Sequence, residues 1–259
     1  MFDFTGKSAL LLGGAGYLGT AAAGGLVEQG ANVLIADFKD EALAPCAATL
    51  KARAKKGVRI ETMHGDARDE GSIKACVAKA VSLFGKLDLA VYMAFRSISK
   101  KVDDLSGPEF DEANHVNVTG AFLFAREAAS KMTSGGSLVL FSSMYGYIAP
   151  DPRMYVPPMN PNPIEYGAGK ASVEQMVRYL AVHYAPRNIR VNGIRPGSFP
   201  FVSTQQNDLG FTGRLNNKVP LGRVGQASEM AGPVVFLLSD DASYVTGHIL
   251  TVDGGWTAW

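Results

Sequence analysis

The chain has 259 residues, of which 47% are hydrophobic and 19% are charged. This length and composition suit one large α/β domain and exclude a disordered chain, because enough apolar surface is available to build a core. The formal net charge of +1 argues against a nucleic-acid partner, whose binding needs a clustered basic excess. The longest basic run, residues 51–56, is expected to form the solvated face of a helix.

Cysteine usage and hydrophobic patterning narrow the kinds of site. Only Cys46 and Cys76 occur, without a CxxC pair or a Cys/His cluster, so neither a disulfide framework nor a metal site is expected. Residues 1–7 lack the basic and apolar regions of a signal peptide, and no apolar run reaches the roughly 20 residues that cross a bilayer. These features predict a cytoplasmic protein that has no membrane partner.

Short β-type runs alternate with longer helical patterns along the chain. This alternation predicts parallel strands with helical crossovers, and therefore an α/β fold with a Rossmann-type, doubly wound sheet covered on both faces. No repeat or linker divides the sequence, so residues 1–259 are predicted to form a single domain. The expected strands are Ser8–Leu12, Asn32–Ala36, Val58–Met63, Leu87–Met93, Ser137–Phe141, Ile189–Ile194 and His248–Val252. The expected helices include Leu18–Gln29, Glu41–Lys55, Glu70–Phe84, Glu109–Lys131 and Ala168–Tyr184.

Two segments interrupt the alternation. Residues 147–164 contain six prolines and cannot form a regular helix or a central strand. Residues 197–218 are polar and rich in Gly, Asn, Ser and Thr, which indicates a loop. Long loops in a compact domain are usually functional, and both segments follow strands at the edge where doubly wound sheets bind ligands. We therefore expect substrate-loop insertions near 147–164 and near 197–218.

A glycine-rich turn links the first expected strand to the first expected helix. Gly13, Gly16 and Gly19 would permit a tight turn and a close approach of a pyrophosphate to the helix N-terminus. Asp37 ends the second strand, 18 residues after Gly19. A carboxylate at this position can accept hydrogen bonds from the adenosine ribose and would repel a 2′-phosphate. This pattern favours NAD over NADP as cofactor.

Tyr166 and Lys170 stand four residues apart where a helix begins, so both side chains would lie on one face. A tyrosine of ordinary pKa, about 10, is a poor base near pH 7, but a neighbouring ammonium group favours the phenolate. Lys170 could also reach the nicotinamide ribose. The pair follows the fifth expected strand and Ser142–Ser143. These features predict Tyr166 as the acid/base of an oxidoreductase.

Several short motifs stand in a fixed order along the chain. They are GGAGYLG at 13–19, Asp37, Asp66 in HGDARD, Asn117 in HVNVTG, FSSMYG at 141–146, YGAGK at 166–170, RPG at 195–197 and TVDGGW at 251–256. Jointly, and over essentially the whole chain, they resemble the short-chain dehydrogenase/reductase family in its single-domain form. The resemblance implies hydride transfer between a nicotinamide and an alcohol or ketone. It also implies a homotetramer or homodimer paired through the long helices Glu109–Lys131 and Ala168–Tyr184.

The resemblance assigns a role to each residue of the catalytic set. Tyr166 would exchange the proton with the substrate oxygen, and Lys170 would orient the ribose and lower the pKa of the tyrosine. Ser143 would hydrogen-bond the substrate oxygen, with Ser142 as the neighbouring alternative. Asn117 would hold a water molecule in the proton relay.

The same resemblance implies the contacts to the cofactor. Asp66 would contact the adenine, and residues 195–197 would lie beside the nicotinamide. A loop hydroxyl, Ser203 or Thr204, would reach the carboxamide. The complete expected cofactor set is Gly13, Gly16, Tyr17, Leu18, Gly19, Asp37, Asp66, Ala67, Ala94, Tyr166, Lys170, Pro196 and Gly197.

Three departures from the family pattern are specific to this chain. The GxxGxxG spacing is seen more in larger sugar-nucleotide members, and Leu12 replaces the usual threonine before Gly13. Residues 92–95 read Tyr-Met-Ala-Phe instead of Asn-Asn-Ala-Gly, so Phe95 and Arg96 are expected to reshape the nicotinamide side of the pocket. Ser143 and Tyr166 are separated by more residues than usual, and the proline-rich segment is expected to fill the difference as a substrate-facing loop.

Polar side chains near these departures suggest the substrate. Arg96 and Arg153 suit an anionic group, while Tyr155, Asn160 and Asn162 suit hydroxyls, which favours a small molecule such as a sugar, sugar acid or polyol. The alternative is that Arg96 and Arg153 make structural contacts and do not bind the substrate. Other functions left open are reduction of an apolar, aromatic or carrier-bound ketone, and nucleotide-dependent regulation without catalysis. The expected substrate contacts are Arg96, Ser143, Arg153, Tyr155 and Tyr166.

Overall fold

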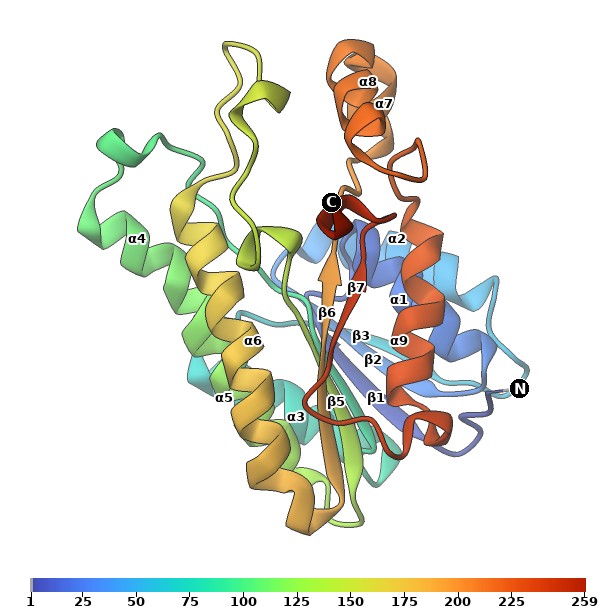
Figure 1. Ribbon diagram of the computed structural model, residues 1–259. Helices are drawn as coiled ribbons and strands as arrows, with labels where there is room; N and C mark the ends of the chain where they lie inside the picture. The colour runs from blue at the N-terminus through green and yellow to red at the C-terminus, as the bar shows by residue number, and fades with distance from the viewer. Residues whose placement is uncertain (1) are drawn as a thin grey trace.

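Seven parallel strands form one sheet in the computed structural model, which describes residues 2–259 (Figure 1). The strand order is β3-β2-β1-β4-β5-β6-β7, with the order reversing next to β1 as in a Rossmann-type fold. The predicted fold class is confirmed, and each strand boundary lies within two residues of its prediction. The strands are β1 Ser8–Leu12, β2 Asn32–Asp37, β3 Ile60–His64, β4 Leu89–Tyr92, β5 Gly136–Phe141, β6 Ile189–Pro196 and β7 Ile249–Val252.

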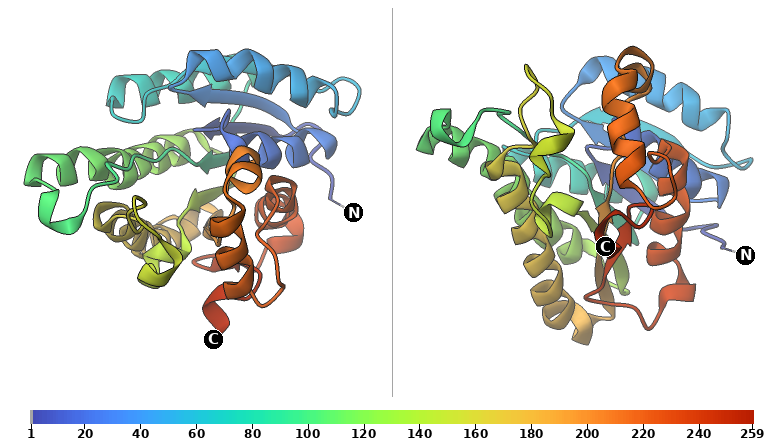
Figure 2. Two further views of the ribbon diagram at one scale, coloured as in Figure 1. Left: turned by 90° about the horizontal axis from the view of Figure 1, so that it is seen from above. Right: turned by 45° about the horizontal axis from the view of Figure 1, so that its top comes forward.

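Helices cover both faces of the sheet, and each face has its own apolar core (Figures 1 and 2). The central strands are buried along their whole length because both of their faces are covered, as their near-continuous apolar sequence predicts. On one face lie α1 Tyr17–Glu28, α2 Asp40–Lys51 and α9 Ala231–Leu238. On the other face lie α3 Glu70–Phe84, α5 Ala121–Lys131 and α6 Ile164–Tyr184.

The helix expected over residues 109–131 is interrupted in the structure. Helix α4, Gly107–Asn114, begins with a capping box between Ser106 and Glu109, and α5 follows only after a π-helical segment, His115–Gly120. The buried hydroxyl of Tyr92 donates to the carbonyl of Val116 at 2.6 Å within this segment. The wider π-helical turn is a local irregularity of the kind often found at functional sites.

The expectation of a loop over residues 197–218 was wrong. This segment forms two helices, α7 Val202–Asn207 and α8 Leu209–Lys218, which Figure 1 shows above the carboxyl ends of the strands. Asp208 caps α8 by accepting a hydrogen bond from the Phe211 amide at 2.8 Å. Leu215 packs into a small cluster with Trp256, so a few apolar contacts hold a helix that is otherwise polar.

The proline-rich segment is irregular, as predicted. Residues 147–163 contain only one short 3₁₀ turn, Pro152–Met154, and extend beyond the carboxyl ends of the strands (Figure 1). Helix α6 begins at Ile164 rather than at Ala168, which places Tyr166 in its first turn.

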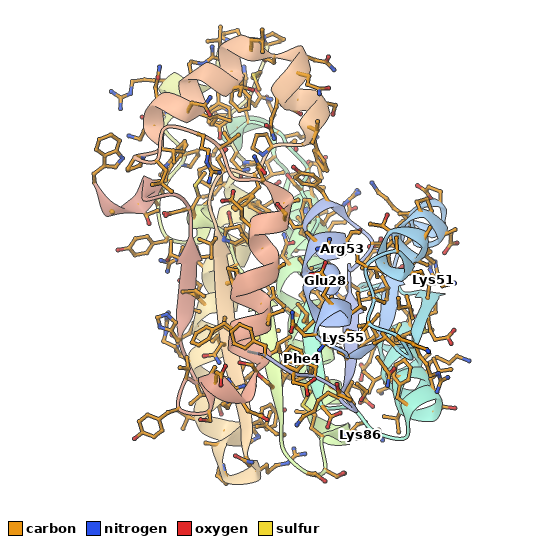
Figure 3. All side chains as sticks on the ribbon, turned by 90° about the vertical axis from the view of Figure 1, so that its right-hand side faces the viewer. Phe4, Glu28, Lys51, Arg53, Lys55 and Lys86 are labelled. Atoms are coloured by element: carbon orange, nitrogen blue, oxygen red, sulfur yellow. The ribbon has the colours of Figure 1, made fainter. Side chains whose placement is uncertain are left out.

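The basic run at 51–56 departs from its expected helical conformation. Helix α2 ends at Lys51, and the following residues turn away from it. Arg53 extends to α1, where its Nε donates to Glu28 at 2.7 Å, as the neighbouring labels in Figure 3 show. This position next to α1 places the guanidinium at one end of a surface pocket.

The glycine-rich turn after β1 depends on two of its glycines for different reasons. Gly13 has a left-handed backbone, with φ of +80°, and a Cβ there would lie 2.4 Å from the amide nitrogen of Ala94. At Gly19 a Cβ would lie 2.6 Å from the carbonyl oxygen of Gly14. At Gly16 the nearest atom would be 3.8 Å away. The turn is therefore packed tightly at its two ends and open in its middle.

Gly13→Ala should lower the free energy of unfolding by more than about 1 kcal/mol, because the substitution adds both backbone strain and a clash. Gly16→Ala is the matched control and should unfold within about 0.5 kcal/mol of the unsubstituted chain. Urea unfolding of the three proteins without cofactor measures this difference. Equal stability of the two variants would contradict the assigned packing.

Candidate active site

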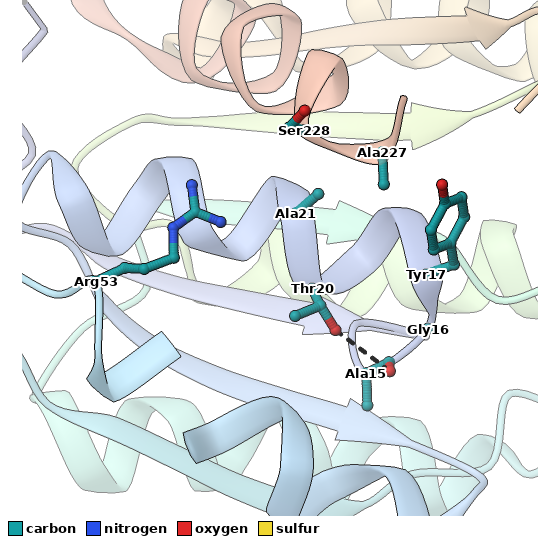
Figure 4. Close-up of a pocket in the computed structure, with 8 residues that line it drawn as sticks. All are labelled: Ala15, Gly16, Tyr17, Thr20, Ala21, Arg53, Ala227 and Ser228. Atoms are coloured by element: carbon teal, nitrogen blue, oxygen red, sulfur yellow. Dashed lines mark hydrogen bonds between the residues drawn. The ribbon is translucent and has the colours of Figure 1, made fainter. Parts of the chain in front are cut away.

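The first turn of α1 offers a place for an anionic group. Its leading backbone amides have no partner within the helix and carry the positive end of the helix dipole. A pocket of about 370 Å³ opens beside this turn, lined by Ala15, Gly16 and Tyr17 and ending at Arg53 (Figure 4). The ring of Tyr17 packs against Phe201, 5.3 Å between centroids, so the residue before α7 borders the same turn. The free amides of this turn fit the pyrophosphate of a dinucleotide, while the pocket itself continues along the side of α1 between Arg53 and Ala227.

Asp37 lies at the carboxyl end of β2 and is bound to the glycine-rich turn. Its carboxylate accepts hydrogen bonds from the amides of Ala15, at 3.0 Å, and Lys39, at 3.1 Å. The side chain is only partly buried, so further acceptor capacity faces the open edge of the sheet. A carboxylate in this position fits the diol of an adenosine ribose.

Next to Asp37 the structure places Phe38 and Arg68, two residues that are absent from the expected cofactor set. The guanidinium of Arg68 lies 4.6 Å from the ring centroid of Phe38 and also forms an ion pair with Asp66 at 2.8 Å. This hydrogen bond to Arg68 is the main cause that lowers the pKa of Asp66. Asp66, expected at the adenine, is thus already paired, while Ala67 beside it is buried. The exposed ring of Phe38 offers a flat apolar surface for a base.

The structure brings Tyr166, Lys170 and Ser143 together at the carboxyl end of β5. Lys170 is 2% exposed, and its Nζ donates to the carbonyl of Phe141 at 2.8 Å. The same nitrogen lies 5.5 Å from the centroid of the Tyr166 ring. The spacing in the sequence predicts that Tyr166 and Lys170 share one helix face, and Ser143, which follows β5, completes the group.

Burial shifts the proton affinities of this pair. Burial raises the pKa of Tyr166, and a hydrogen bond with the Ser143 hydroxyl offsets part of the increase. Burial also lowers the pKa of Lys170, to about 7. Near neutral pH the tyrosine therefore holds its proton while the lysine exchanges one readily, an arrangement suited to general acid/base chemistry.

The two serines of the FSSMYG motif differ in their surroundings. The Ser142 hydroxyl is buried, 2.9 Å from a carboxylate oxygen of Glu174 and 3.0 Å from the carbonyl of Lys170. Glu174 in turn forms a two-point ion pair with Arg195, at 2.7 and 2.8 Å. Ser142 is thus engaged in a structural network, and Ser143 is the serine that interacts with Tyr166.

Asn117 lies in the π-helical segment and is fully buried. Its side-chain oxygen accepts from the Arg96 amide at 3.0 Å, and its nitrogen donates to the Arg96 carbonyl at 2.8 Å. A Cβ on Gly169 would lie 2.9 Å from the Asn117 Cβ, so α6 packs closely here. The side chain is therefore occupied by the backbone of the segment that follows β4.

The two arginines expected at the substrate are both paired with carboxylates. Arg96 contacts Glu112 at 2.6 Å. Arg153 contacts Asp151 at 2.7 Å, with 80% of its side chain exposed. Tyr155, in the proline-rich segment, instead has its hydroxyl 2.7 Å from the hydroxyl of Tyr145. Sequence reasoning missed Tyr145, although it stands in the FSSMYG motif two residues after the serine.

The remaining expected cofactor residues line the carboxyl edge of the sheet. Ala94 follows β4 and touches Gly13, and Leu18 lies partly buried in the first turn of α1. Pro196 ends β6, and a Cβ on Gly197 would lie 2.5 Å from Asp253, so the backbone there has no room for a side chain. Ser203 and Thr204 lie on helix α7 instead of a loop.

Within residues 2–259, no group of three or more His, Cys, Asp or Glu side chains is arranged to hold a metal ion. Over the same residues, no helix combines the length and the apolar character needed to cross a membrane.

Comparison with known proteins agrees with this geometry. A family model described as enoyl-(acyl carrier protein) reductase matches residues 14–257. A 2,5-dichloro-2,5-cyclohexadiene-1,4-diol dehydrogenase of Sphingobium indicum is 34% identical, with 100% of both chains covered. A glucose 1-dehydrogenase of Gluconobacter oxydans is 31% identical, covering 99% of this chain and 94% of its own. The crystal structure of an NAD⁺-bound xylitol dehydrogenase, 29% identical, superposes with a TM-score of 0.85 and covers 97% of this chain and 99% of its own.

The fold and the site define an oxidoreductase that uses a nicotinamide cofactor. The chain belongs to the short-chain dehydrogenase/reductase family, and its activity is that of an alcohol oxidoreductase in this family. The predicted family and enzyme class are therefore confirmed.

Lys170→Met should raise the thermal midpoint at pH 7 by a few degrees while removing the buried amine. The folded-state pKa of Lys170 is about 7, against 10.5 for an ordinary lysine. Between these values the unfolded chain binds a proton that the folded chain lacks, so the stability of the unsubstituted chain rises with pH. The advantage of the variant should therefore shrink from pH 7 towards alkaline pH.

Thermal unfolding at several pH values measures this effect. Lys79→Met, at an exposed position of α3, is the control and should follow the unsubstituted chain at every pH. If the difference in thermal midpoint between Lys170→Met and the unsubstituted chain is the same at all pH values, protonation of Lys170 does not destabilise the fold, and the assigned pKa is contradicted.

Proposed function

We propose that this protein is an NAD-dependent dehydrogenase that oxidises a secondary alcohol to a ketone, with Tyr166 as the acid/base. The observation that carries the proposal is the grouping of Ser143, Tyr166 and buried Lys170 at the same sheet edge as the glycine-rich turn. Reduction of a ketone follows the same steps in reverse.

In the proposed mechanism the proton of the substrate hydroxyl passes to the phenolate oxygen of Tyr166. The Ser143 hydroxyl donates a hydrogen bond to the same substrate oxygen, and the ammonium form of Lys170 stabilises the phenolate. A nicotinamide cofactor, bound through the glycine-rich turn and Asp37, would accept the hydride from the substrate carbon. Asn117 contributes by fixing the backbone at Arg96, since its own side chain is engaged there.

The substrate that this site supports best is a neutral molecule with several hydroxyls, such as a sugar, a polyol or a cyclic diol. Arg96 and Arg153 each have a carboxylate partner, which weakens the case for a sugar acid. The paired hydroxyls of Tyr145 and Tyr155 supply polar groups on aromatic rings, a surface suited to hydroxylated rings. The names of the relatives, a glucose 1-dehydrogenase and a cyclohexadienediol dehydrogenase, support the same class.

We also propose that the irregular segment 147–163 and helices α7 and α8 border the substrate, and that the chain forms a homotetramer or homodimer. Exposed apolar side chains on the outer surfaces of α5 and α6 support the pairing of copies: Phe122 is 41% exposed, Tyr179 69% and Val182 78%. A sedimentation mass of one chain would contradict this assembly.

Tyr166→Phe should lower kcat by at least about a thousandfold, because it removes the only hydroxyl proposed to transfer the proton. Binding of NADH should stay within about twofold of the unsubstituted protein, since the ring is retained. Formation of NADH, followed by its absorbance with sugars, polyols, cyclic diols, sugar acids and apolar alcohols, measures the activity. Turnover of apolar alcohols alone would refute the substrate class, and an active Tyr166→Phe would refute the role of the tyrosine.

Asp37→Ser should reduce the preference for NAD over NADP by at least about tenfold in kcat/KM, because it removes both the ribose acceptor and the repulsion of a 2′-phosphate. Asp40→Ser is the control, since Asp40 is exposed and its carboxylate contacts His64. An unchanged preference in Asp37→Ser would show that another residue selects the cofactor.

A further inference from the structure

The segment after β4 runs beside the catalytic tyrosine. Phe95 lies edge-on to Tyr166, with ring centroids 5.9 Å apart and planes at 76°, and its side chain is 61% exposed. It stands where the family pattern has glycine, so this chain places a large apolar group where a small one is usual. An exposed aromatic ring therefore packs against the ring of Tyr166 at a position where the family pattern has no side chain.

Glu165, the residue before Tyr166, binds the backbone of the same segment through its side chain. Its Oε1 accepts a hydrogen bond from the Ile98 amide at 2.8 Å and a longer one from the Ser99 amide at 3.4 Å. The side chain is completely buried, although it lies in the first turn of α6. Glu165 therefore links the helix that carries Tyr166 to the backbone that carries Phe95.

Ser99 shows that this linkage constrains the backbone. Its φ of +61° lies in the left-handed region, which a serine rarely adopts. Such a conformation persists where the surroundings over-determine it. Glu165 contacts the amide of Ser99, and Asn160 of the proline-rich segment donates to its carbonyl at 3.4 Å. The two loops on this side of the site are thus joined at one strained residue.

The burial of Glu165 is costly and is not fully compensated. Its Oε2 is buried and has no hydrogen-bond partner among residues 2–259. A buried carboxyl group with so few partners usually destabilises a fold relative to an apolar side chain of the same size. Its placement is therefore explained better by the backbone geometry that it imposes than by a contribution to stability.

We propose that Glu165 is a positioning residue that, through the Ile98 and Ser99 amides, holds Phe95 against Tyr166, and that Phe95 sets the width of substrate that reaches the tyrosine. The inference rests on the proposed role of Tyr166 as acid/base. Asn117 still holds the backbone at Arg96 when the contacts to Ile98 and Ser99 are lost. Loss of the linkage therefore loosens the segment beyond Arg96 and lets the Phe95 ring tilt away from Tyr166, which widens the space in front of the hydroxyl.

Steady-state oxidation of 2,3-butanediol and of the bulkier 1-phenyl-1,2-ethanediol tests this assignment. Phe95→Ala should raise kcat/KM for the bulky diol relative to the compact one by about tenfold. Glu165→Ala should shift the ratio in the same direction, mainly through KM, while the Kd for NADH stays the same. Glu165→Gln should restore the original ratio, because its carbonyl oxygen can accept from the same two amides.

Glu112→Ala is the matched control. It removes a carboxylate that contacts the side chain of Arg96 in the same segment but leaves the backbone linkage intact, so the ratio should not change. If Glu165→Ala does not fold, Phe95→Ala and Glu165→Gln still decide the matter. An unchanged diol ratio in Phe95→Ala would overturn the proposal, and so would a Glu165→Gln that fails to keep the original ratio.

Hydrogen exchange of the Ile98 and Ser99 amides gives a readout that is independent of catalysis. Both amides should exchange at least about tenfold faster in Glu165→Ala and at the original rate in Glu165→Gln. Absence of alcohol oxidation by the unsubstituted protein would refute the proposed function, whereas unchanged exchange in Glu165→Ala would refute the linkage itself.

Discussion

The site depends on one buried amine. The Nζ of Lys170 is held by the carbonyl of Phe141 at the end of β5 and lies beneath the ring of Tyr166. Because this amine is removed from water, its pKa falls to about 7, and a protein selected for stability alone would place an apolar residue there. The position makes sense for an amine that exchanges a proton near neutral pH beside a tyrosine whose own pKa burial has raised. The hydrogen bond to Phe141 ties the buried amine to the carboxyl end of β5.

Helix α6 transmits that constraint to the rest of the sheet edge. Its consecutive turns present Tyr166, Lys170 and Glu174 on one face, and Glu174 joins the ends of β5 and β6 through Ser142 and Arg195. A polar network of this kind, buried and paired at both ends, specifies the relative position of strands more strictly than apolar packing does. The segment after β4 and the proline-rich segment, which we propose to border the substrate, are attached to the same helix at its first turn.

The sequence predicts the parts of this account that rest on local pattern. Continuous apolar runs locate the strands, and the spacing of the glycines and of Tyr166 with Lys170 locates both halves of the site. The helices over 197–218 were missed because their polar surfaces hide the few apolar contacts, such as Leu215 with Trp256, that stabilise them. Pairing across long sequence separations is also invisible in a sequence: nothing near Arg96 indicates that Glu112 will neutralise it. By contrast, Asp151 stands only two residues from Arg153, so that ion pair was within reach of the sequence.

The pH dependence of alcohol oxidation tests the central claim most directly. If Tyr166 accepts the substrate proton and burial raises its pKa, kcat/KM for NAD-linked oxidation should increase from neutral to alkaline pH and then level off. The opposite reaction, ketone reduction, should slow over the same range. An oxidation rate that is independent of pH, or no NADH formation with any alcohol at any pH, would contradict the account.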